Sequence, residues 1–494
     1  MTNNLTILRR TAAQVLAAAA LEQFPGASLV GGFGSHLGFH YDFTFPFAFH
    51  KDFLPLLEER MRAVIKKNYK IEIKEMVPKN AALFFEHRKQ FHVADKALDL
   101  EEVLASIFQM GDFFDLAEPS FLRHSGEVAS FKLVEAKTFG DGVTRIYGTA
   151  FFDKSALKEY LKKLKNYPEI DHIILGKEMD LFSSYKEGFW KWHPKGAFIR
   201  ETLLNWWKKE HIKQSFQFPL VPAISTKEEL LKAHLEFAPR AAETVYLKRS
   251  CSEDELMGMF STKGETQDIV HIFCGAGDLV QESISSLQFI TKISKILSFE
   301  WQAVLCVGRG RQNASWKKAK EALENALKYC ELEYDCDDET FVDRGPRLEL
   351  RFQDGLGRFW SGPYLEIACA HMCLVRSMFG SVERIVALLI EQGQGMLPLW
   401  LAPEQARVFT VSQNAEQFAD ECVTYLSALG LRIGVDRNLE QKLGSRLHGA
   451  LIEKVPYCIF IGDREKNLKT VTVRAYGSTK DEQVSLDALA QKFK

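Results

Sequence analysis

The stretch Lys263-Gly-Glu-Thr-Gln-Asp-Ile-Val-His271-Ile-Phe-Cys274 lies near the middle of the chain and decides its fold. It joins a polar Thr-Gln-Asp triplet to a histidine within an apolar run. A second segment, Gly380-Ser-Val-Glu-Arg384-Ile-Val-Ala-Leu-Leu-Ile-Glu391, sets an arginine at the start of another apolar run. The rest of the chain is organised around these two segments.

The two segments resemble the catalytic core of threonyl-tRNA synthetases, which are class II aminoacyl-tRNA synthetases. The resemblance covers nearly the whole chain but includes no counterpart of the family's ubiquitin-like first domain. It implies an α+β multidomain fold: a class II antiparallel sheet with helices, preceded by an editing-like α+β domain and followed by an α/β anticodon-binding domain. The implied boundaries are 1–165 (editing-like), 166–185 (linker helix), 186–397 (catalytic-like) and 398–494 (anticodon-binding-like).

Length and composition agree with several folded domains. A chain of 494 residues with 46% hydrophobic and 26% charged residues is too long for one core and is not disordered. The formal net charge of −2 does not indicate a nucleic-acid partner, so any RNA contact must use local basic patches. The nine cysteines form no CxxC pair and predict reduced thiols in a cytoplasmic protein. The apolar run Ala12–Leu21 is too short to span a bilayer.

The first region reads as an α+β domain. Leu5–Phe24 predicts a helix ended by Pro25-Gly26, Ile71–Met76 predicts a half-exposed strand, and Thr144–Asp153 predicts a strand that leads into a helix. The order of these pieces resembles the family's editing domain. That domain hydrolyses mischarged serine with a His-x-x-x-His pair and a distant Cys and His, but here Arg10-Thr-Ala-Ala-Gln14 and Asp115–Phe121 stand in their places. We therefore expect no editing, and a domain kept for packing or RNA contact.

The segments that follow resemble the linker and class II motif 1. Asp171–Phe182 matches the family linker helix, and Phe189–Gly196 with the helix Ala197–His211 and a strand ending at Pro222 matches motif 1. In the family this motif builds the dimer interface, so the resemblance implies a homodimer.

The last region alternates strands and helices. Val408–Val411, Arg432–Val435 and Tyr457–Ile461 predict strands, whereas Glu416–Leu429 and Gln441–Glu453 have helical spacing. This pattern predicts a small α/β domain, and the stretch resembles the family's anticodon-binding domain.

The resemblance assigns an adenylation site to four residues. Attack of an amino-acid carboxylate on the α-phosphate of ATP builds negative charge, which positioned arginines stabilise through two donors each. Arg249 falls on the motif 2 arginine and Arg384 on the motif 3 arginine, so these are the catalytic candidates. Gln267 and Arg347 fall on ATP- or substrate-binding positions, and ATP with magnesium is the implied cofactor. Cys251 replaces the glutamate that holds the adenine in the family. A surface helix role for Arg384 and a non-catalytic role for Arg249 are the alternatives.

The zinc ion with which the family selects threonine is predicted to be absent. It needs one Cys and two His, and only His271 lies on a ligand position. The cysteine-bearing segment has no counterpart, and the second histidine position is Val375. One alternative remains: Cys369, His371 and Cys373, if helical, could rebuild a site with His271.

The substrate pocket also differs from that of the family. In the strand before this cluster Ser361, Tyr364 and Glu366 stand where the family has Gln, Thr and Gln, so the resemblance implies an altered pocket.

Contact with tRNA is implied by Arg437, Lys442 and Arg446 in the last region. Lysine runs at 158–165 and 317–320 are more typical of solvated helix faces. Three hypotheses remain: a tRNA-binding paralogue of threonyl-tRNA synthetase with threonine activation lost or strongly altered, an active ATP-dependent aminoacyl ligase for threonine or another amino acid, and a non-catalytic regulatory subunit.

Overall fold

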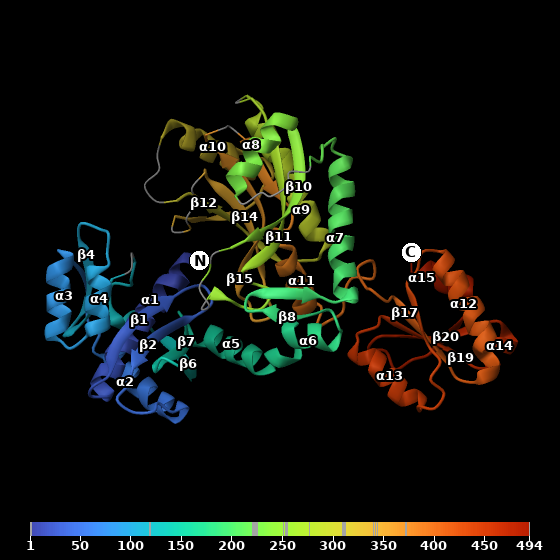
Figure 1. Ribbon diagram of the computed structural model, residues 1–494, viewed down its shortest axis with the longest axis horizontal. Coiled ribbons are helices and arrows are strands. Elements are labelled where there is room, and N and C mark those ends of the chain that lie inside the picture. The colour runs from blue at the N-terminus through green and yellow to red at the C-terminus, as the bar shows by residue number, and fades with distance from the viewer. Residues whose placement is uncertain are drawn as a thin grey trace. The chain divides into compact units, whose positions relative to one another are not determined.

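The computed structural model describes residues 2–117, 120–219, 226–249, 251, 255–275, 277–308, 313–338, 340, 342, 344–370 and 373–493. These residues form two compact units, Met1–Lys165 and Asn166–Lys494 (Figure 1). No described helix is long and apolar enough to cross a membrane.

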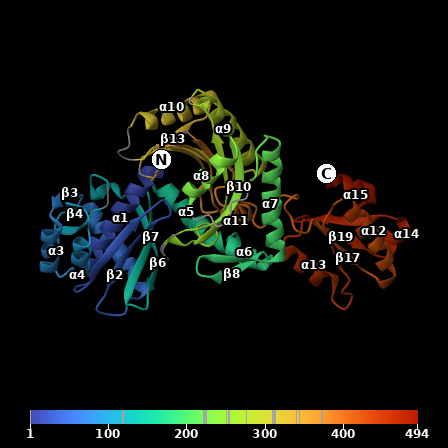
Figure 2. The same cartoon turned by 45° about the horizontal axis from the view of Figure 1, so that its top comes forward.

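The N-terminal unit packs α1 across a four-stranded antiparallel sheet of order β1-β2-β7-β6 (Figure 2). The alanine-rich face of α1 is fully buried, because small side chains let the helix approach the sheet closely. A Cβ on Gly34 of β1 would lie 2.4 Å from the backbone nitrogen of Arg10, so this contact requires glycine. The elements are α1 (Thr2–Gln23), β1 (Ser28–Gly34), β2 (Phe39–Thr44), α2 (Leu54–Lys66), β6 (Ser130–Thr138), β7 (Val143–Phe151) and α5 (Lys154–Asn166).

A second layer of this unit is a three-stranded sheet with two short helices. Its order is β3-β4-β5, and its core includes Phe85, Phe108 and Phe113. The elements are β3 (Ile71–Met76), α3 (Pro78–His87), α4 (Phe91–Leu98), β4 (Ala105–Met110) and β5 (Phe113–Leu116). The predicted first helix, half-exposed strand and strand-to-helix step are all confirmed.

The C-terminal unit is built on a seven-stranded sheet of order β10-β11-β16-β15-β14-β12-β13. Neighbouring strands are antiparallel except β12 and β13, so the expected antiparallel sheet is confirmed. Helix α9 packs on β15 and β16, α8 packs on β10 and β11, and α11 contacts β11. The strands are β10 (Arg240–Lys248), β11 (Gly264–Phe273), β12 (Trp301–Cys306), β13 (Tyr334–Asp337), β14 (Arg347–Gln353), β15 (Phe359–Ala368) and β16 (Cys373–Ser377).

Helices and a hairpin precede and surround this sheet. The predicted linker and motif 1 helices are present as α6 and α7, whereas Pro222 lies outside the described residues. The elements are α6 (His172–Glu178), β8 (Phe182–Lys186), β9 (Phe189–Trp192), α7 (Pro194–Ile212), α8 (Lys227–Phe237), α9 (Leu279–Ile296), α10 (Ala314–Tyr329) and α11 (Val382–Gln392).

The last part of the chain forms a five-stranded sheet of order β18-β17-β19-β20-β21. Strands β18, β17 and β19 are parallel and are joined by helices, as expected for an α/β domain. All three predicted strands and both predicted helices are confirmed. The elements are β17 (Ala406–Thr410), α12 (Glu416–Ala428), β18 (Ile433–Asp436), α13 (Leu443–Ile452), β19 (Tyr457–Ile461), α14 (Asp463–Leu468), β20 (Val471–Ala475), β21 (Glu482–Val484) and α15 (Leu486–Lys492).

Candidate active site

Asp268 ties the opening stretch to the turn that precedes α11. Its buried carboxylate accepts hydrogen bonds from the Ser377 hydroxyl at 2.7 Å and from the backbone N–H groups of Met378 at 2.6 Å and Phe379 at 3.0 Å. Burial raises the pKa of Asp268 to about 6. The aspartate of the Thr-Gln-Asp triplet thus holds the backbone in place.

Glu383 makes the reciprocal connection from α11 to β11. Its carboxylate accepts the Thr266 N–H at 2.7 Å and the Thr266 hydroxyl at 3.0 Å, and burial raises its pKa. Gln267, on the opposite face of the strand, donates from its amide nitrogen to Glu265. The segments 263–274 and 380–391 are therefore joined by the hydrogen bonds of Asp268 and Glu383. Gln267 faces away from these hydrogen bonds.

Arg384 lies half-buried at the start of α11. Its Nε donates to the Phe260 carbonyl at 2.8 Å and its Nη1 to the Ser361 carbonyl at 2.7 Å, while Glu265 lies 3.9 Å away. Burial lowers the pKa of its guanidinium, which remains charged at neutral pH. Two backbone carbonyls hold this half-buried guanidinium, so Arg384 is not a freely exposed residue of a surface helix.

Arg249 contacts the other end of the same backbone segment. The backbone N–H of Arg249 donates to the Lys263 carbonyl at 2.8 Å. The guanidinium donates to the Ser261 hydroxyl at 3.3 Å and to the Glu255 carboxylate at 3.1 Å. The charges of Arg249 and Arg384 interact. The structure therefore brings the two catalytic candidates to one segment, residues 260–263. Cys251, at the position of the adenine-binding glutamate, donates weakly to the Thr262 carbonyl at 3.9 Å.

Arg347 on β14 points at carboxylates of the sheet. Its Nε donates to Glu366 at 2.7 Å, Glu349 lies 3.6 Å away, and its guanidinium stacks 4.9 Å from the Tyr364 ring. Burial alone would lower the pKa of Arg347, but Glu366 and Glu349 hold it above its usual value. Arg344 also lies 2.7 Å from Glu366. Arg347 is thus paired with Glu366, one of the three residues that differ from the family's polar residues in the pocket strand.

His271 is hydrogen bonded to a second histidine. The Nδ1 atoms of His271 and His234 lie 2.8 Å apart, and His234 Nε2 lies 3.2 Å from Glu243. Both imidazoles are fully buried, and burial lowers the pKa of His234 against the opposing effect of Glu243. Val375 pairs directly with His271 on the neighbouring strand. Sequence reasoning missed His234 and Glu243, because nothing in their spacing places α8 over β11.

The described donors around His271 do not fit a zinc ion. His271 and His234 are in hydrogen-bond contact, and with Glu243 they do not form a group of three whose ligand atoms all lie within 4.8 Å of one another, whereas such a site uses three converging ligands. Among the described residues, the one group of three whose ligand atoms do lie within 4.8 Å of one another is elsewhere, at Asp171, His172 and Glu391. The alternative site at Cys369 and Cys373 required both residues to lie on one helix, and this condition is not met, since Cys373 begins strand β16 and Cys369 lies in the turn before it. His371 lies outside the described residues.

The editing positions of the N-terminal unit form a packed polar contact. Asp115 accepts a hydrogen bond from the Tyr41 hydroxyl at 2.5 Å and another from Gln14, and both Asp115 and Tyr41 are buried. Burial raises the pKa of both groups. Residues 118 and 119 of the predicted loop lie outside the described residues.

The three residues expected to contact tRNA differ in exposure. Arg446 on α13 is buried, and its guanidinium donates to Asp436 at 2.9 Å and to the Thr410 carbonyl at 2.9 Å. Arg437 is half-exposed and pairs with Asp420. Lys442 is the residue before α13. Arg446 therefore connects α13 to β17 and β18, whereas Arg437 faces solvent.

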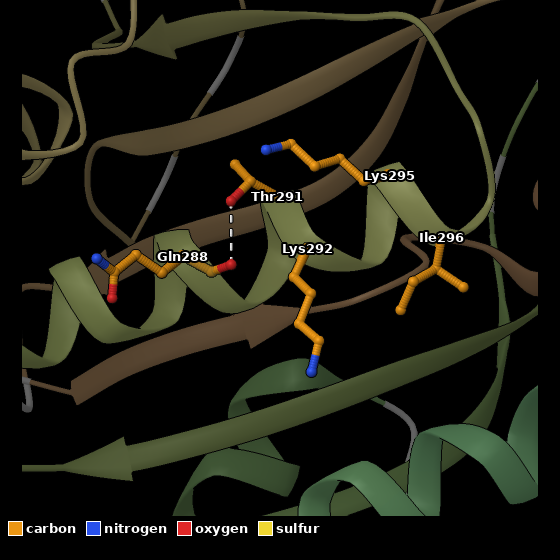
Figure 3. Close-up of a pocket in the computed structure, with 5 residues that line it drawn as sticks. All are labelled: Gln288, Thr291, Lys292, Lys295 and Ile296. Carbon is orange, nitrogen blue, oxygen red and sulfur yellow. Dashed lines mark hydrogen bonds between the residues drawn. The ribbon is translucent and has the colours of Figure 1, made fainter.

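A surface hollow lies along the outer side of α9. Five residues of this one helix line it: Gln288, Thr291, Lys292, Lys295 and Ile296 (Figure 3). The Thr291 hydroxyl donates to helix carbonyls of its own preceding turn. The hollow brings together none of the predicted site residues.

Comparison with known proteins assigns the chain to a family. Residues 405–494 match the anticodon binding domain model. The threonine–tRNA ligase of Pelobacter propionicus is 30% identical over 95% of this chain and 85% of its own length, and that of Dehalococcoides mccartyi (strain BAV1) is 29% identical over 96% and 93%. The crystal structure of the RNA binding domain of threonyl-tRNA synthetase from Cryptosporidium parvum superposes with a TM-score of 0.57 at 22% identity, covering 66% of this chain and 97% of that one, which supports the fold. The chain belongs to the threonine–tRNA ligase family of class II aminoacyl-tRNA synthetases.

Proposed function

We propose that the protein is a tRNA-binding member of this family in which ordinary threonine activation is lost or strongly altered. One observation carries the proposal: His271 is hydrogen bonded to His234 and faces Val375, so the described residues there supply too few ligands for zinc. A threonine hydroxyl would have no metal to bind at this position.

The C-terminal domain supports the tRNA part of the proposal. The match to the anticodon binding domain model covers residues 405–494, and Arg437 and Lys442 lie in that region. Exposed cationic side chains can contact phosphates and unpaired bases. Arg446 acts in this proposal by holding α13 in place.

An active aminoacyl ligase is the second candidate, and the placement of two arginines favours it. Arg249 and Arg384 both contact residues 260–263, so a phosphate bound there would meet two guanidinium groups. In this candidate ATP with magnesium is the co-substrate, Arg249 and Arg384 stabilise the transition state, and Gln267 and Arg347 bind substrate. A regulatory subunit without nucleotide chemistry is the remaining alternative.

The domain roles and the assembly are part of the same proposal. Residues 1–165 act as an editing-like domain without editing residues, 166–185 as a linker, 186–397 as a catalytic-like domain and 398–494 as an anticodon-binding-like domain. Residues of motif 1 would form a homodimer, which sedimentation or light scattering of the purified chain would test.

ATP–pyrophosphate exchange with each of the twenty amino acids tests the catalytic part. We expect no exchange with threonine, with or without added zinc, because the described residues around His271 supply too few ligands for zinc. Exchange with threonine at the rate of an ordinary family member would overturn the proposal. Exchange with another amino acid that is lost in Arg384→Gln would establish the ligase candidate.

A gel shift with total tRNA tests the binding part. We expect the wild type to retard tRNA and Arg437→Ala to bind several-fold more weakly. Arg474→Ala is the matched control, because Arg474 also pairs with an aspartate, Asp481, on the same domain. Absence of any retardation at low salt would favour the regulatory subunit instead.

A further inference from the structure

His172 of helix α6 contacts a carboxylate that three separate segments share. Glu391, buried at the end of α11, accepts hydrogen bonds from the Tyr167 hydroxyl at 2.5 Å and the Gly355 N–H at 3.0 Å. It also lies 2.7 Å from His172 Nδ1. Because the carboxylate can only accept, Nδ1 of His172 carries the proton in this contact.

The other ring nitrogen of His172 bonds to Met259, which directly precedes the segment 260–263 that Arg249 and Arg384 contact. Nε2 accepts the Met259 N–H at 3.1 Å, and the ring packs edge-on against Phe260 with centroids 4.5 Å apart. Gly258 has φ +54°, and a Cβ there would lie 2.5 Å from His172 Nε2. Trp190 Nε1 donates to the Gly258 carbonyl at 3.2 Å. The imidazole therefore acts as donor on one side and acceptor on the other.

The backbone of Phe260, which follows Met259, is in turn hydrogen bonded to Arg384. The Phe260 carbonyl accepts the Nε of Arg384 at 2.8 Å. The Phe260 ring stacks on Trp360 with centroids 4.8 Å apart and planes 12° apart. The orientation of the Arg384 side chain thus depends on the position of the Phe260 carbonyl. His172 bonds to Met259, the residue before Phe260.

The same residues do not offer an open cation site. Ligand atoms of Asp171, His172 and Glu391 lie within 4.8 Å of one another. However, Asp171 accepts the Ile173 N–H at 2.7 Å as the cap of α6, and both His172 nitrogens have hydrogen-bond partners. A metal would have to displace these hydrogen bonds.

We propose that His172 is a positioning residue that fixes the 258–260 backbone and thereby the guanidinium of Arg384. The linker helix α6 in this way sets the geometry of the phosphate-binding arginine from outside the sheet. The proposal rests on the proposed function only in its last step, the binding of a nucleotide phosphate by Arg384.

Amide hydrogen exchange of the full chain tests the first step, and it does so whether or not the protein binds ATP. His172→Phe keeps an aromatic ring but removes both hydrogen bonds of the imidazole nitrogens, so we expect roughly tenfold faster exchange at Met259 and Phe260. His172→Gln should restore slow exchange, because an amide can donate to Glu391 and accept from Met259. Tyr167→Phe, which removes only one bond to Glu391, is the matched control and should leave Met259 unchanged.

Four outcomes would overturn the proposal. Exchange at Met259 could be the same in His172→Phe and the wild type, or it could rise equally across the whole chain, which would indicate a general loss of stability. A ¹⁵N spectrum with the proton on His172 Nε2 would contradict the tautomer. Stoichiometric metal in the purified wild type that is lost in His172→Phe would assign these residues to a cation site.

Binding of ATP tests the last step separately. If the wild type binds ATP, His172→Phe should raise its dissociation constant severalfold and His172→Gln should not, whereas an equal affinity in all three would overturn this step. If the wild type does not bind ATP, the role of Arg384 in nucleotide binding fails, and the exchange experiment still decides the role of His172.

Discussion

Asp268 shows how one side chain of the opening stretch supports the site. Its carboxylate accepts hydrogen bonds from two backbone N–H groups and one hydroxyl, and all three donor residues are buried, where an unpaired polar group is costly. The residue that identifies the motif in the sequence therefore acts through the backbone before α11.

Replacing Asp268 tests this role. We expect Asp268→Ala to lower the free energy of unfolding by about 3 kcal/mol or more, because it leaves buried donors without their acceptor. Urea denaturation followed by fluorescence measures the change. Asp278→Ala, at the exposed residue before α9, should change stability by less than about 0.5 kcal/mol. Equal effects in the two variants would contradict the role assigned to Asp268.

His211 on α7 gives the protein a predictable sensitivity to acid. Burial and the charge of Arg376 lower the pKa of His211 to about 3, while its Nδ1–H donates to the Trp207 carbonyl at 2.8 Å. In the unfolded chain the imidazole binds a proton near pH 6.5, so between that value and about 3 the unfolded state binds more protons than the folded state. Stability from this residue is present above pH 6.5 and is lost as the pH falls.

The free energy of unfolding should accordingly fall by up to about 1.4 kcal/mol per pH unit below pH 6.5 on account of this residue. The variant His211→Gln cannot take up the proton, so its curve of stability against pH should be flatter over pH 4–6. Urea denaturation at several pH values provides the measurement. Parallel curves for the two proteins would show that His211 is protonated in the folded state.

At the scale of elements, α13 depends on Arg446 for its attachment to the C-terminal sheet. The guanidinium bonds to Asp436 at the end of β18 and to the carbonyl of Thr410 at the end of β17. The sequence predicts both Arg446 and Arg437 as tRNA contacts, and the structure gives them different surroundings. Only the tertiary contacts distinguish a side chain that binds within the domain from one that faces solvent.

Substitution by lysine separates these two arginines. We expect Arg446→Lys to lower the free energy of unfolding by about 1–3 kcal/mol, because an ammonium group cannot reproduce the planar set of donors. Arg437→Lys should change stability by less than about 0.5 kcal/mol, since its ion pair with Asp420 is exposed. Thermal denaturation of the full chain measures both. A stable Arg446→Lys that binds tRNA weakly would instead assign Arg446 to the RNA surface.

At the scale of the whole molecule, stability and fold should not depend on zinc. The described neighbours of His271 supply one further imidazole, which is held by Glu243. A protein with a structural zinc site loses folding free energy when the metal is removed. We expect the unfolding temperature to stay within about 1 °C after treatment with a chelator, because the described residues around His271 supply too few ligands for a stabilising zinc ion. Zinc at one equivalent per chain, with a large fall in unfolding temperature on chelation, would contradict this.

Much of the fold follows from the sequence. Apolar periodicity and turn residues predict the strands and helices of the C-terminal domain, because strands and helices bury side chains at different spacings. The resemblance of the two opening segments predicts the antiparallel sheet. The segment around Cys373 shows the limit: the sequence left a helix open as an alternative there, because a short apolar run fits either a strand or a helix. Sheet pairing of Cys373 with Phe273 and Ala368 decides for the strand.

The sequence by itself determined the family, and it predicts the order of the domains and the loss of two of the three expected zinc ligands, since these depend on which residue stands at which position. Only the tertiary structure decided what surrounds His271, Arg384 and Arg446. His234 reaches His271 because α8 packs over β10 and β11, and His172 reaches Met259 because α6 packs against α11. Such contacts join residues far apart in the chain, and no local pattern records them.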